Sequence, residues 1–293
     1  MSGAGGNAAA GASLRAPSLR GATLAGAGAI GLWAFLALLT REAAGVPPIE
    51  LTAMAFTVSG TAGLAWLTAR RRLGVLRQKP LAWAHGVGGL AGYHALYFAA
   101  LSMAPAAVAN LLNYAWPLLI VLLSAPILGM RLRARHLVGV ALGAVGCALL
   151  IRPEGGGAWL GYALALGAGL TWALYSVLAR RMAAVPTEAV AGFCAAAAAI
   201  CWVLHAVAEP AVMPGPRALV AAGLMGLGPV GAAFFLWDRG MKQGDPRLLG
   251  TLAYATPVAS TLLLVLGGFA PASLLLGVAA VLVAAGGLIA ARG

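Results

Sequence analysis

The chain has 293 residues, of which 62% are hydrophobic and only 9% charged, and its mean hydropathy is +0.93. Soluble domains carry about 25% charged residues, so this composition excludes a soluble protein and indicates one that crosses a membrane repeatedly. The net charge of +12 does not indicate a nucleic-acid-binding protein, because the basic residues lie in loops between apolar runs and lack the aromatic interleaving of a soluble binding face.

Residues 1–19 are rich in Gly, Ala and Ser without apolar periodicity, and we expect them to form a disordered cytoplasmic tail. Ten apolar runs follow, each near the roughly 20 residues that a helix needs to span a bilayer. They are continuously apolar rather than alternating, which favours helices over the strands of a β-barrel. The sequence therefore predicts an all-α membrane protein with ten transmembrane helices, at residues 21–40, 49–69, 81–102, 105–127, 135–151, 158–179, 188–207, 217–238, 247–268 and 272–291.

Lys and Arg are distributed unevenly over the loops between these runs. Sixteen of them fall on one side of the predicted membrane, and three, Arg41, Arg152 and Arg217, fall on the other. Because cytoplasmic loops carry the excess of basic residues, we predict that both termini are cytoplasmic.

Two halves of the chain echo each other at an offset of about 139 residues. Trp33-Ala34 corresponds to Trp172-Ala173, and Tyr114-Ala115-Trp116-Pro117 corresponds to Tyr254-Ala255-Thr256-Pro257. We expect one five-helix repeat over 20–152, a linker over 153–157 and a second five-helix repeat over 158–293. Five crossings per repeat would invert the second half relative to the first, which places a substrate site between the halves and permits alternating access around a central cavity.

Polar residues form stripes on two neighbouring predicted helices. Tyr93 and Tyr97 lie one turn apart beside His94, and Asn110, Asn113 and Tyr114 share one face of the next helix. Buried Asn and His are costly in hydrocarbon unless they are paired or face water. We therefore predict that these residues bind substrate in the cavity, and polar contacts between helices remain the alternative interpretation.

Aromatic residues near the middle of other predicted helices extend this site. They would supply ring contacts that suit a planar aromatic solute. We predict Trp33, Trp172, Tyr175, Trp237 and Tyr254 as further substrate-binding residues. Pro117 and Pro257 stand at matching positions and each removes a helical hydrogen bond, so we interpret them as hinges, with passive kinks as the alternative.

None of the seven acidic residues lies near the centre of a predicted helix. The absence of a central carboxylate argues against cationic substrates and against a simple carboxylate proton relay. Asp238 is expected to form an interfacial ion pair with the adjacent Arg239. His94 is the one titratable group expected at the centre, where we predict a neutral imidazole that hydrogen-bonds to substrate rather than carrying protons.

The sequence predicts no catalytic residues, no metal site and no cofactor. The three cysteines lie in apolar runs, where Cys commonly acts as a small hydrophobic residue, and we expect the four histidines to have no acidic or cysteine partner at ligand spacing. An integral-membrane enzyme is therefore not expected, since it would need a nucleophile with a base, clustered ligands or paired carboxylates.

The ten helices in two halves, the Trp-Ala pair in each first helix and the Pro in each fourth helix resemble the EamA-type drug/metabolite transporters over residues 20–291. Within that family, Tyr93-His94-x-x-Tyr97 and Asn113-Tyr114-Ala115-Trp116-Pro117 look most like the bacterial aromatic amino-acid exporters of the YddG type. The resemblance implies helices arranged as a basket around a central cavity, location in the inner membrane, and export of aromatic amino acids and related compounds. Many family members carry an acidic residue after the fourth helix of a repeat, which this chain lacks.

Two functional hypotheses remain open at this stage. The first is a secondary carrier that exports aromatic amino acids and similar hydrophobic metabolites. The second is a carrier of the same fold for other small molecules, such as nucleobases or neutral drugs. The sequence leaves the energy source and the oligomeric state open. The predicted partners are a small-molecule substrate and the lipid bilayer, and no nucleic acid is expected.

Overall fold

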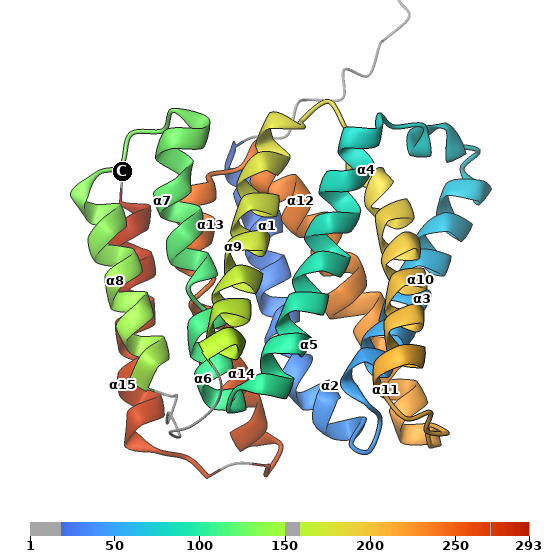
Figure 1. Cartoon of the computed structure of the whole chain (residues 1–293). Helices are drawn as coiled ribbons and strands as arrows, with labels where there is room; N and C mark the ends of the chain where they lie inside the picture. The colour runs from blue at the N-terminus through green and yellow to red at the C-terminus, as the bar shows by residue number, and fades with distance from the viewer. Residues whose placement is uncertain (1–18, 150–158, 270, 293) are drawn as a thin grey trace, which may run out of the picture.

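The computed structural model describes residues 19–149, 159–269 and 271–292, and within these ranges the chain is helical and contains no strand. The start of α1 (Leu19–Trp33) and the end of α15 (Leu274–Ala291) lie at the same, upper edge of the molecule (Figure 1). Leu19, which was assigned to the tail, already belongs to α1. The rest of the predicted tail, Arg152 and the linker 153–157 lie outside the described residues.

The elements fall before and after the undescribed stretch 150–158. Those before it are α1, α2 (Leu36–Glu42), α3 (Pro48–Ala69), the 3₁₀ turn η1 (Leu73–Leu76), α4 (Pro80–Val87), the π-helical segment η2 (Gly88–Gly92), α5 (Tyr93–Met103), α6 (Ala106–Asn113), α7 (Trp116–Leu128) and α8 (Ala134–Leu149). Those after it are α9 (Trp159–Arg181), the 3₁₀ turn η3 (Thr187–Ala189), α10 (Val190–Ala208), α11 (Pro216–Leu227), the π-helical segment η4 (Gly228–Ala232), α12 (Ala233–Gln243), α13 (Pro246–Leu252), α14 (Ala255–Leu266) and α15.

Seven helical stretches among the described residues are long and apolar enough to cross a membrane. They are Leu19–Glu42, Pro48–Ala69, Trp159–Arg181, Thr187–Ala208, Pro216–Gln243, Pro246–Leu266 and Leu274–Ala291, and Trp116–Leu128 and Ala134–Gly146 are shorter apolar helices. The chain is therefore a multi-pass helical membrane protein. The expected spans 81–102 and 105–127 coincide with interrupted helices, α4–η2–α5 and α6–α7, and the total of ten spans stays a prediction.

The main helix contacts join the first half of the chain to the second. Helix α3 packs on α10, α8 on α15, α1 on α12, and both α5 and α7 pack on α9. The halves thus interleave rather than forming separate domains (Figure 1). The largest hydrophobic core consequently lies where they meet and contains Trp33, Phe56, Trp116, Trp172 and Trp237.

Glycines let these helix pairs approach closely. A Cβ atom added to Gly60 of α3 would lie 2.7 Å from the Cα of Ala195 in α10, and one added to Gly139 of α8 would lie 2.6 Å from the carbonyl oxygen of Gly286 in α15. Small residues at such crossings allow backbone contact, which drives helix association in membranes where lipid is as apolar as the side chains.

Polar contacts fasten the α3–α10 pair at both ends. At one end the Glu209 carboxylate accepts hydrogen bonds from the backbone N–H groups of Ile49 and Glu50, at 2.9 and 3.0 Å, and so satisfies two free donors at the start of α3. At the other end Arg72 forms an ion pair of 2.7 Å with Glu188. These contacts at both ends hold the two helices in one register. Nδ1 of His205 in α10 lies 3.1 Å from the Glu209 carboxylate, so the expectation that the histidines lack an acidic partner was wrong, because residues four apart share a helical face.

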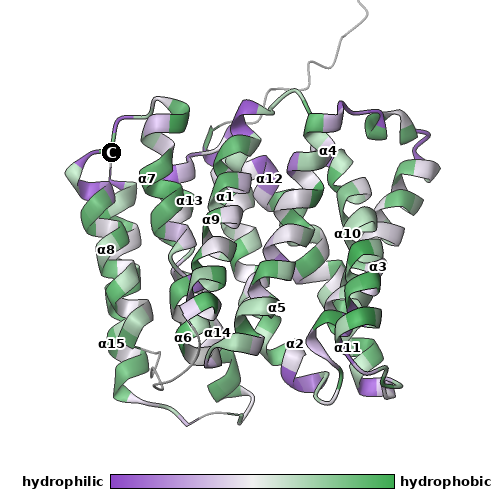
Figure 2. Cartoon of the chain, in the orientation of Figure 1, coloured by the Kyte–Doolittle hydropathy of each residue, from purple (hydrophilic) through white to green (hydrophobic). Residues whose placement is uncertain are grey.

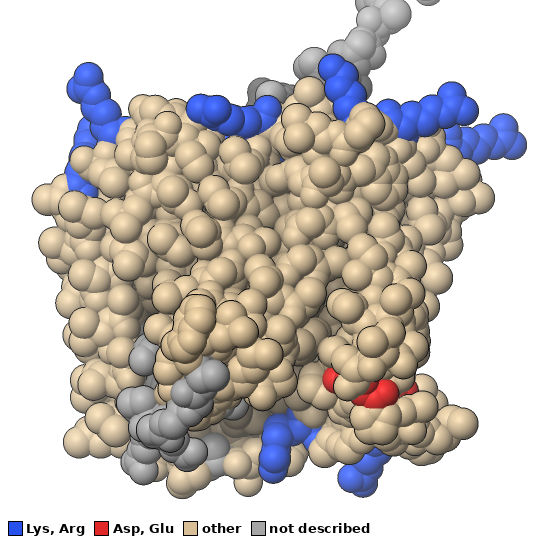
Figure 3. Space-filling view, in the orientation of Figure 1, with Lys and Arg blue, Asp and Glu red and all other residues tan. Residues whose placement is uncertain are grey.

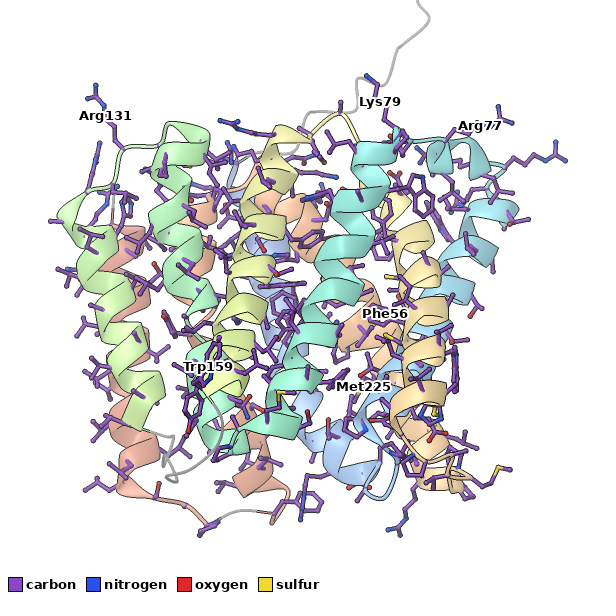
Figure 4. The ribbon with its side chains drawn as sticks, in the orientation of Figure 1. Phe56, Arg77, Lys79, Arg131, Trp159 and Met225 are labelled. Atoms are coloured by element: carbon purple, nitrogen blue, oxygen red, sulfur yellow. The ribbon has the colours of Figure 1, made fainter. Side chains whose placement is uncertain are left out.

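Hydrophobic residues cover the helices, whereas hydrophilic residues gather at their ends (Figure 2). Lys and Arg side chains crowd the upper edge of the molecule and leave an uncharged belt below it (Figure 3). Arg77, Lys79 and Arg131 all extend from that edge (Figure 4). This belt is the surface that a bilayer would cover.

We expect Gly60→Ala to lower the melting temperature of the purified protein in detergent, because the new methyl group would overlap backbone atoms of α10 that cannot move aside. Overpacking of this kind costs about 1–3 kcal/mol. Gly223→Ala in α11 is the matched control, since a Cβ atom there has no atom within 4 Å and the higher helix propensity of Ala should leave stability equal or raised. Equal melting temperatures for Gly60→Ala and wild type would contradict the close packing of α3 on α10.

Candidate substrate cavity

A cavity of about 490 Å³ lies between the two halves. It reaches from buried rings to exposed Thr40 and Pro48, which lie at the end of α2 and the start of α3. The connection between α2 and α3 lies at the lower edge of the molecule, opposite the edge at which α1 begins (Figure 1). Its lining comprises Trp33, Leu36, Ala37, Thr40, Val46, Pro48, Leu51, Thr52, Tyr93, His94, Tyr97, Phe98, Leu101, Asn110, Asn113, Tyr114, Trp116, Trp172, Met225, Pro229, Val230, Phe234, Thr256 and Ser260. Ligand pockets for small molecules span about 300–1,000 Å³, so this one fits an amino-acid-sized solute.

Tryptophans from four helices meet at the inner end of the cavity. Trp33 packs edge-on against Trp116 and Trp172, with ring centroids 6.2 and 5.7 Å apart, and lies 5.0 Å from Trp237. Phe234 packs against Trp172 at 5.7 Å. Trp33, Trp116, Trp172 and Phe234 line the cavity, whereas Trp237 lies behind them and is 1% exposed. The result is a rigid aromatic floor.

The two π-helical segments position rings of this cavity. The Nδ1 atom of His94 donates a 2.7 Å hydrogen bond to the carbonyl oxygen of Leu90 in η2, and the indole Nε1 of Trp33 donates one of 2.9 Å to the carbonyl oxygen of Pro229 in η4. Segments η2 and η4 begin 140 residues apart, at Gly88 and Gly228. Short π-helical stretches are frequent at functional sites, and here each fixes the orientation of a cavity ring.

Polar side chains form one wall of the cavity. The hydroxyl of Tyr97 donates to Oδ1 of Asn110, and Nδ2 of Asn113 donates to the hydroxyl of Tyr93 at 3.1 Å. The rings of Tyr93 and Tyr97 stack with centroids 5.9 Å apart. Two neighbouring helices thus pair their polar groups with each other, which is the arrangement that buried polar groups require.

The lining has no Asp, Glu, Lys or Arg among the described residues. Its polar members are neutral hydroxyl, amide and imidazole groups. A solute with a large net charge would lose its hydration without gaining a counter-ion, at a high cost in free energy. The cavity therefore suits a neutral molecule or a zwitterion.

Polar contacts close the molecule between the aromatic floor and the basic edge. Trp237 donates from Nε1 to the hydroxyl of Ser176 at 2.9 Å, and both residues are buried. Asp238 pairs with Lys242 at 2.8 Å and accepts a hydrogen bond from Thr187, while Lys242 also donates to the carbonyl oxygen of Val185. The expected ion pair of Asp238 with Arg239 was wrong, because consecutive helical residues point away from each other whereas residues four apart share a face.

The connection between α12 and α13 is fixed at the basic edge. Asp245 caps α13 by accepting from the backbone N–H of Arg247 at 2.9 Å, and its carboxylate also pairs with the Arg247 side chain at 2.9 Å. Burial of Asp245 opposes ionisation, yet the hydrogen bonds and the charge of Arg247 outweigh it and hold the pKa of this carboxyl below its usual value. Arg247 further donates to the carbonyl oxygen of Arg131, which ties this connection to the first half.

Eight of the eleven side chains predicted to bind substrate line the cavity, namely Trp33, Tyr93, His94, Tyr97, Asn110, Asn113, Tyr114 and Trp172. Three do not. Tyr175 and Trp237 lie between the aromatic floor and the basic edge, and Tyr254 belongs to a separate hydrophobic cluster with Val121 and Val283.

Several lining residues were missed by the sequence analysis. Trp116 stands in the motif Tyr114-Ala115-Trp116-Pro117 and could have been included on that ground. Phe234 is an apolar residue in an apolar run, so no feature of the sequence marked it as a lining residue. Thr256 and Ser260, on α14, lie one turn apart on one helical face, a weak signal that only the position of α14 beside the cavity makes useful.

Pro117 and Pro257 lie just after helix breaks rather than inside continuous helices. Helix α6 ends at Asn113 and α7 begins at Trp116, while α13 ends at Leu252 and α14 begins at Ala255. Each Pro therefore occupies the first turn of a new helix, where its missing N–H costs little. Both breaks adjoin residues of the cavity wall.

Comparisons with known proteins agree with this architecture. The model of the EamA-like transporter family matches residues 20–152 and 159–292. A protein of Ancylobacter novellus named aromatic amino acid exporter YddG is 49% identical over 269 residues, which are 89% of this chain and 94% of that protein. A solved crystal structure is 48% identical, covers 94% of this chain and 98% of its own, and has a TM-score of 0.89. The chain belongs to the EamA-like transporter family.

Proposed function

We propose that this protein is a secondary transporter that exports aromatic amino acids and related hydrophobic metabolites across a bacterial inner membrane. The observation that carries the proposal is the cavity of about 490 Å³, whose floor is built from Trp33, Trp116, Trp172 and Phe234 and whose polar wall is neutral. The relative at 49% identity is named an aromatic amino acid exporter, which supports the same substrate class here.

The aromatic floor accounts for the affinity of the cavity for an aromatic side chain. Burial of an aromatic side chain removes apolar surface from water at about 25 cal/mol per Å², and each well-placed ring pair adds about 0.5–1.5 kcal/mol. Trp33 and Trp172 are held within the cluster by the ring contacts and the hydrogen bond described above, so little side-chain entropy is lost when a ring binds.

We further propose that residues 20–152 and 158–293 form inverted five-helix repeats. The matching π segments and the matching helix breaks before Pro117 and Pro257 support this arrangement. Such repeats provide two near-equivalent packings that open the site to opposite sides of the membrane. Pro117 and Pro257 would act as hinges, because a broken helix can bend there without losing further hydrogen bonds.

The basic edge is the proposed cytoplasmic side, and on this orientation we infer a state that is open to the outside and closed toward the cytoplasm. The Asp238–Lys242 pair and the Trp237–Ser176 hydrogen bond belong to the closed side. A substrate would enter from the cytoplasm after this side opens, and would leave through the cavity mouth near Thr40 and Pro48.

Purified protein in liposomes should exchange labelled phenylalanine or tryptophan across the membrane, and Tyr97→Ala should raise the half-saturating concentration about two- to tenfold through lost ring contacts. Tyr162→Ala is the matched control, because Tyr162 is not among the residues that line the cavity, and its exchange should equal that of wild type. Exchange of nucleobases or neutral drugs without exchange of aromatic amino acids would instead favour the alternative substrate class.

The orientation is tested in intact cells with a cysteine introduced at one of two exposed positions near helix ends. Arg217→Cys should react with a membrane-impermeant maleimide added outside, whereas Arg77→Cys should react only after the cells are permeabilised. Both positions are exposed, and Cys194 and Cys201 are buried. The reverse labelling pattern would refute the proposed topology.

Lys242→Met should lower stability strongly, since it leaves Asp238 buried without its counter-ion, and breaking a buried pair costs about 3–5 kcal/mol. The double variant Asp238→Leu/Lys242→Met should recover much of the lost melting temperature. If the pair also stabilises the closed side, Lys242→Met should slow external maleimide labelling of a Thr40→Cys reporter at the cavity mouth. An unchanged melting temperature in Lys242→Met would rule out a stabilising pair.

A further inference from the structure

One amide oxygen in the cavity wall lacks a hydrogen-bond donor. Asn113 lines the cavity, is 4% exposed, and donates from Nδ2 to Tyr93, but none of the described residues donates to its Oδ1. A buried acceptor left unpaired costs about 1–3 kcal/mol. A ligand that offers a donor to this oxygen would recover that free energy.

The neighbouring His94 also presents an acceptor. A carbonyl oxygen can only accept, so the 2.7 Å contact between Nδ1 of His94 and the Leu90 carbonyl requires the proton of the neutral ring to reside on Nδ1. Nε2 then carries a lone pair, and it has no hydrogen-bond partner among the described residues. The π-helical segment thus fixes not only the orientation of His94 but also which end of its ring accepts.

The side chains of Asn113 and His94, which carry the two acceptors, both contact Tyr93. The hydroxyl of Tyr93 lies 3.1 Å from Nδ2 of Asn113, and its ring centroid lies 4.9 Å from that of His94 and 5.3 Å from that of Trp172. Aromatic faces attract cations through their quadrupole. The surroundings of Tyr93 therefore combine two uncharged acceptors with ring faces, which is a chemistry that suits a primary ammonium group.

Asn110, one turn before Asn113, offers the opposite polarity. Its Oδ1 is occupied by the Tyr97 hydroxyl, which leaves its Nδ2 group as a donor. The two asparagines of α6 thus differ: both line the cavity, and Asn113 holds an unpaired acceptor whereas Asn110 holds a donor. A zwitterion can use both, with its ammonium beside Asn113 and its carboxylate beside Asn110, without any charged residue in the wall.

We propose that Oδ1 of Asn113 and Nε2 of His94 form the subsite for the α-ammonium group of the substrate, and that the protein therefore selects amino-bearing aromatic solutes over carboxylates of the same size that lack the amine. This inference rests on the proposed function. It adds a specificity that the aromatic floor does not supply, because a hydrophobic pocket alone discriminates poorly between solutes of equal shape. Unpaired buried acceptors, in contrast, reject a ligand that has no donor.

The test compares two phenylalanine analogues that differ only in the amine, 4-fluorophenylalanine, which keeps it, and 3-(4-fluorophenyl)propanoate, which lacks it. Their binding to the purified protein in detergent is measured by ligand-induced shifts in melting temperature. Their inhibition of labelled phenylalanine exchange is measured in liposomes. We expect 4-fluorophenylalanine to bind at least about tenfold more tightly than 3-(4-fluorophenyl)propanoate, the difference expected for hydrogen bonds to a charged group.

Asn113→Leu and His94→Leu each remove one acceptor and should reduce this preference to about threefold or less, whereas His94→Gln, which keeps an acceptor oxygen, should retain more of it. Asn110→Leu is the matched control on the same helix: it should weaken binding of phenylalanine yet leave the preference for the amine intact. If one of the two Leu variants does not fold, the preference measured with the other Leu variant still tests the proposal.

Equal binding of the two analogues to wild type, or no thermal shift with either, would overturn the ammonium subsite. An unchanged preference in both Asn113→Leu and His94→Leu would overturn it too. Exchange of labelled phenylalanine with equal inhibition by both analogues would refute the subsite while leaving the proposed function intact. Amine-selective thermal shifts without any exchange would support the subsite and refute transport.

Discussion

The requirement that every polar group inside an apolar slab be satisfied by the protein itself governs this structure. Irregular backbone at membrane depth is tolerated only where it is buried in protein or lines a cavity. Here the irregular segments gather at one place: η2 and η4, and the breaks between α6 and α7 and between α13 and α14, all supply or adjoin residues of the cavity. The cavity is therefore where the protein concentrates its departures from regular helix, and with them its polar groups.

The same constraint explains why the halves interleave. Lipid supplies no hydrophobic force between helices, so close packing and hydrogen bonds must hold them together. Gly60 and Gly139 permit backbone contact across the halves, and the Trp33 indole reaches the Pro229 carbonyl in the other half. A hydrogen bond that satisfies a buried donor thus also positions the floor of the cavity, so stability and recognition share the same contacts.

Apolar run length and the placement of Lys and Arg were enough to predict a multi-pass helical protein, because both follow from the thickness and polarity of a bilayer. The spacing of side chains on single helices was enough to predict that Tyr93, Tyr97, Asn110 and Asn113 belong to one site. Contacts that depend on how a helix is rotated about its axis, and on which elements pack beside it, could not be predicted from one sequence. The partner of Asp238 proved to be Lys242, and the π-helical geometry at Gly88–Gly92, which sets the acceptor of His94, has no local sequence rule.

The three aromatic residues that fall outside the cavity have a common explanation in the proposed inversion of the repeats. By the offset of the halves, Tyr175, Trp237 and Tyr254 correspond to Leu36, Tyr97 and Tyr114, and all three of the latter line the cavity. Inverted repeats place equivalent residues toward opposite faces of the membrane, so the counterparts of an outward wall must lie on the side that is now closed. When the proposed carrier opens to the cytoplasm, Tyr175 and Trp237 would line its cavity, while Trp33, Trp116 and Trp172 would stay at the inner end of the cavity in both states. An aromatic solute would then contact aromatic rings from either side of the membrane, and its binding free energy would be similar in the two states. A carrier needs this similarity because it must release its substrate as well as bind it.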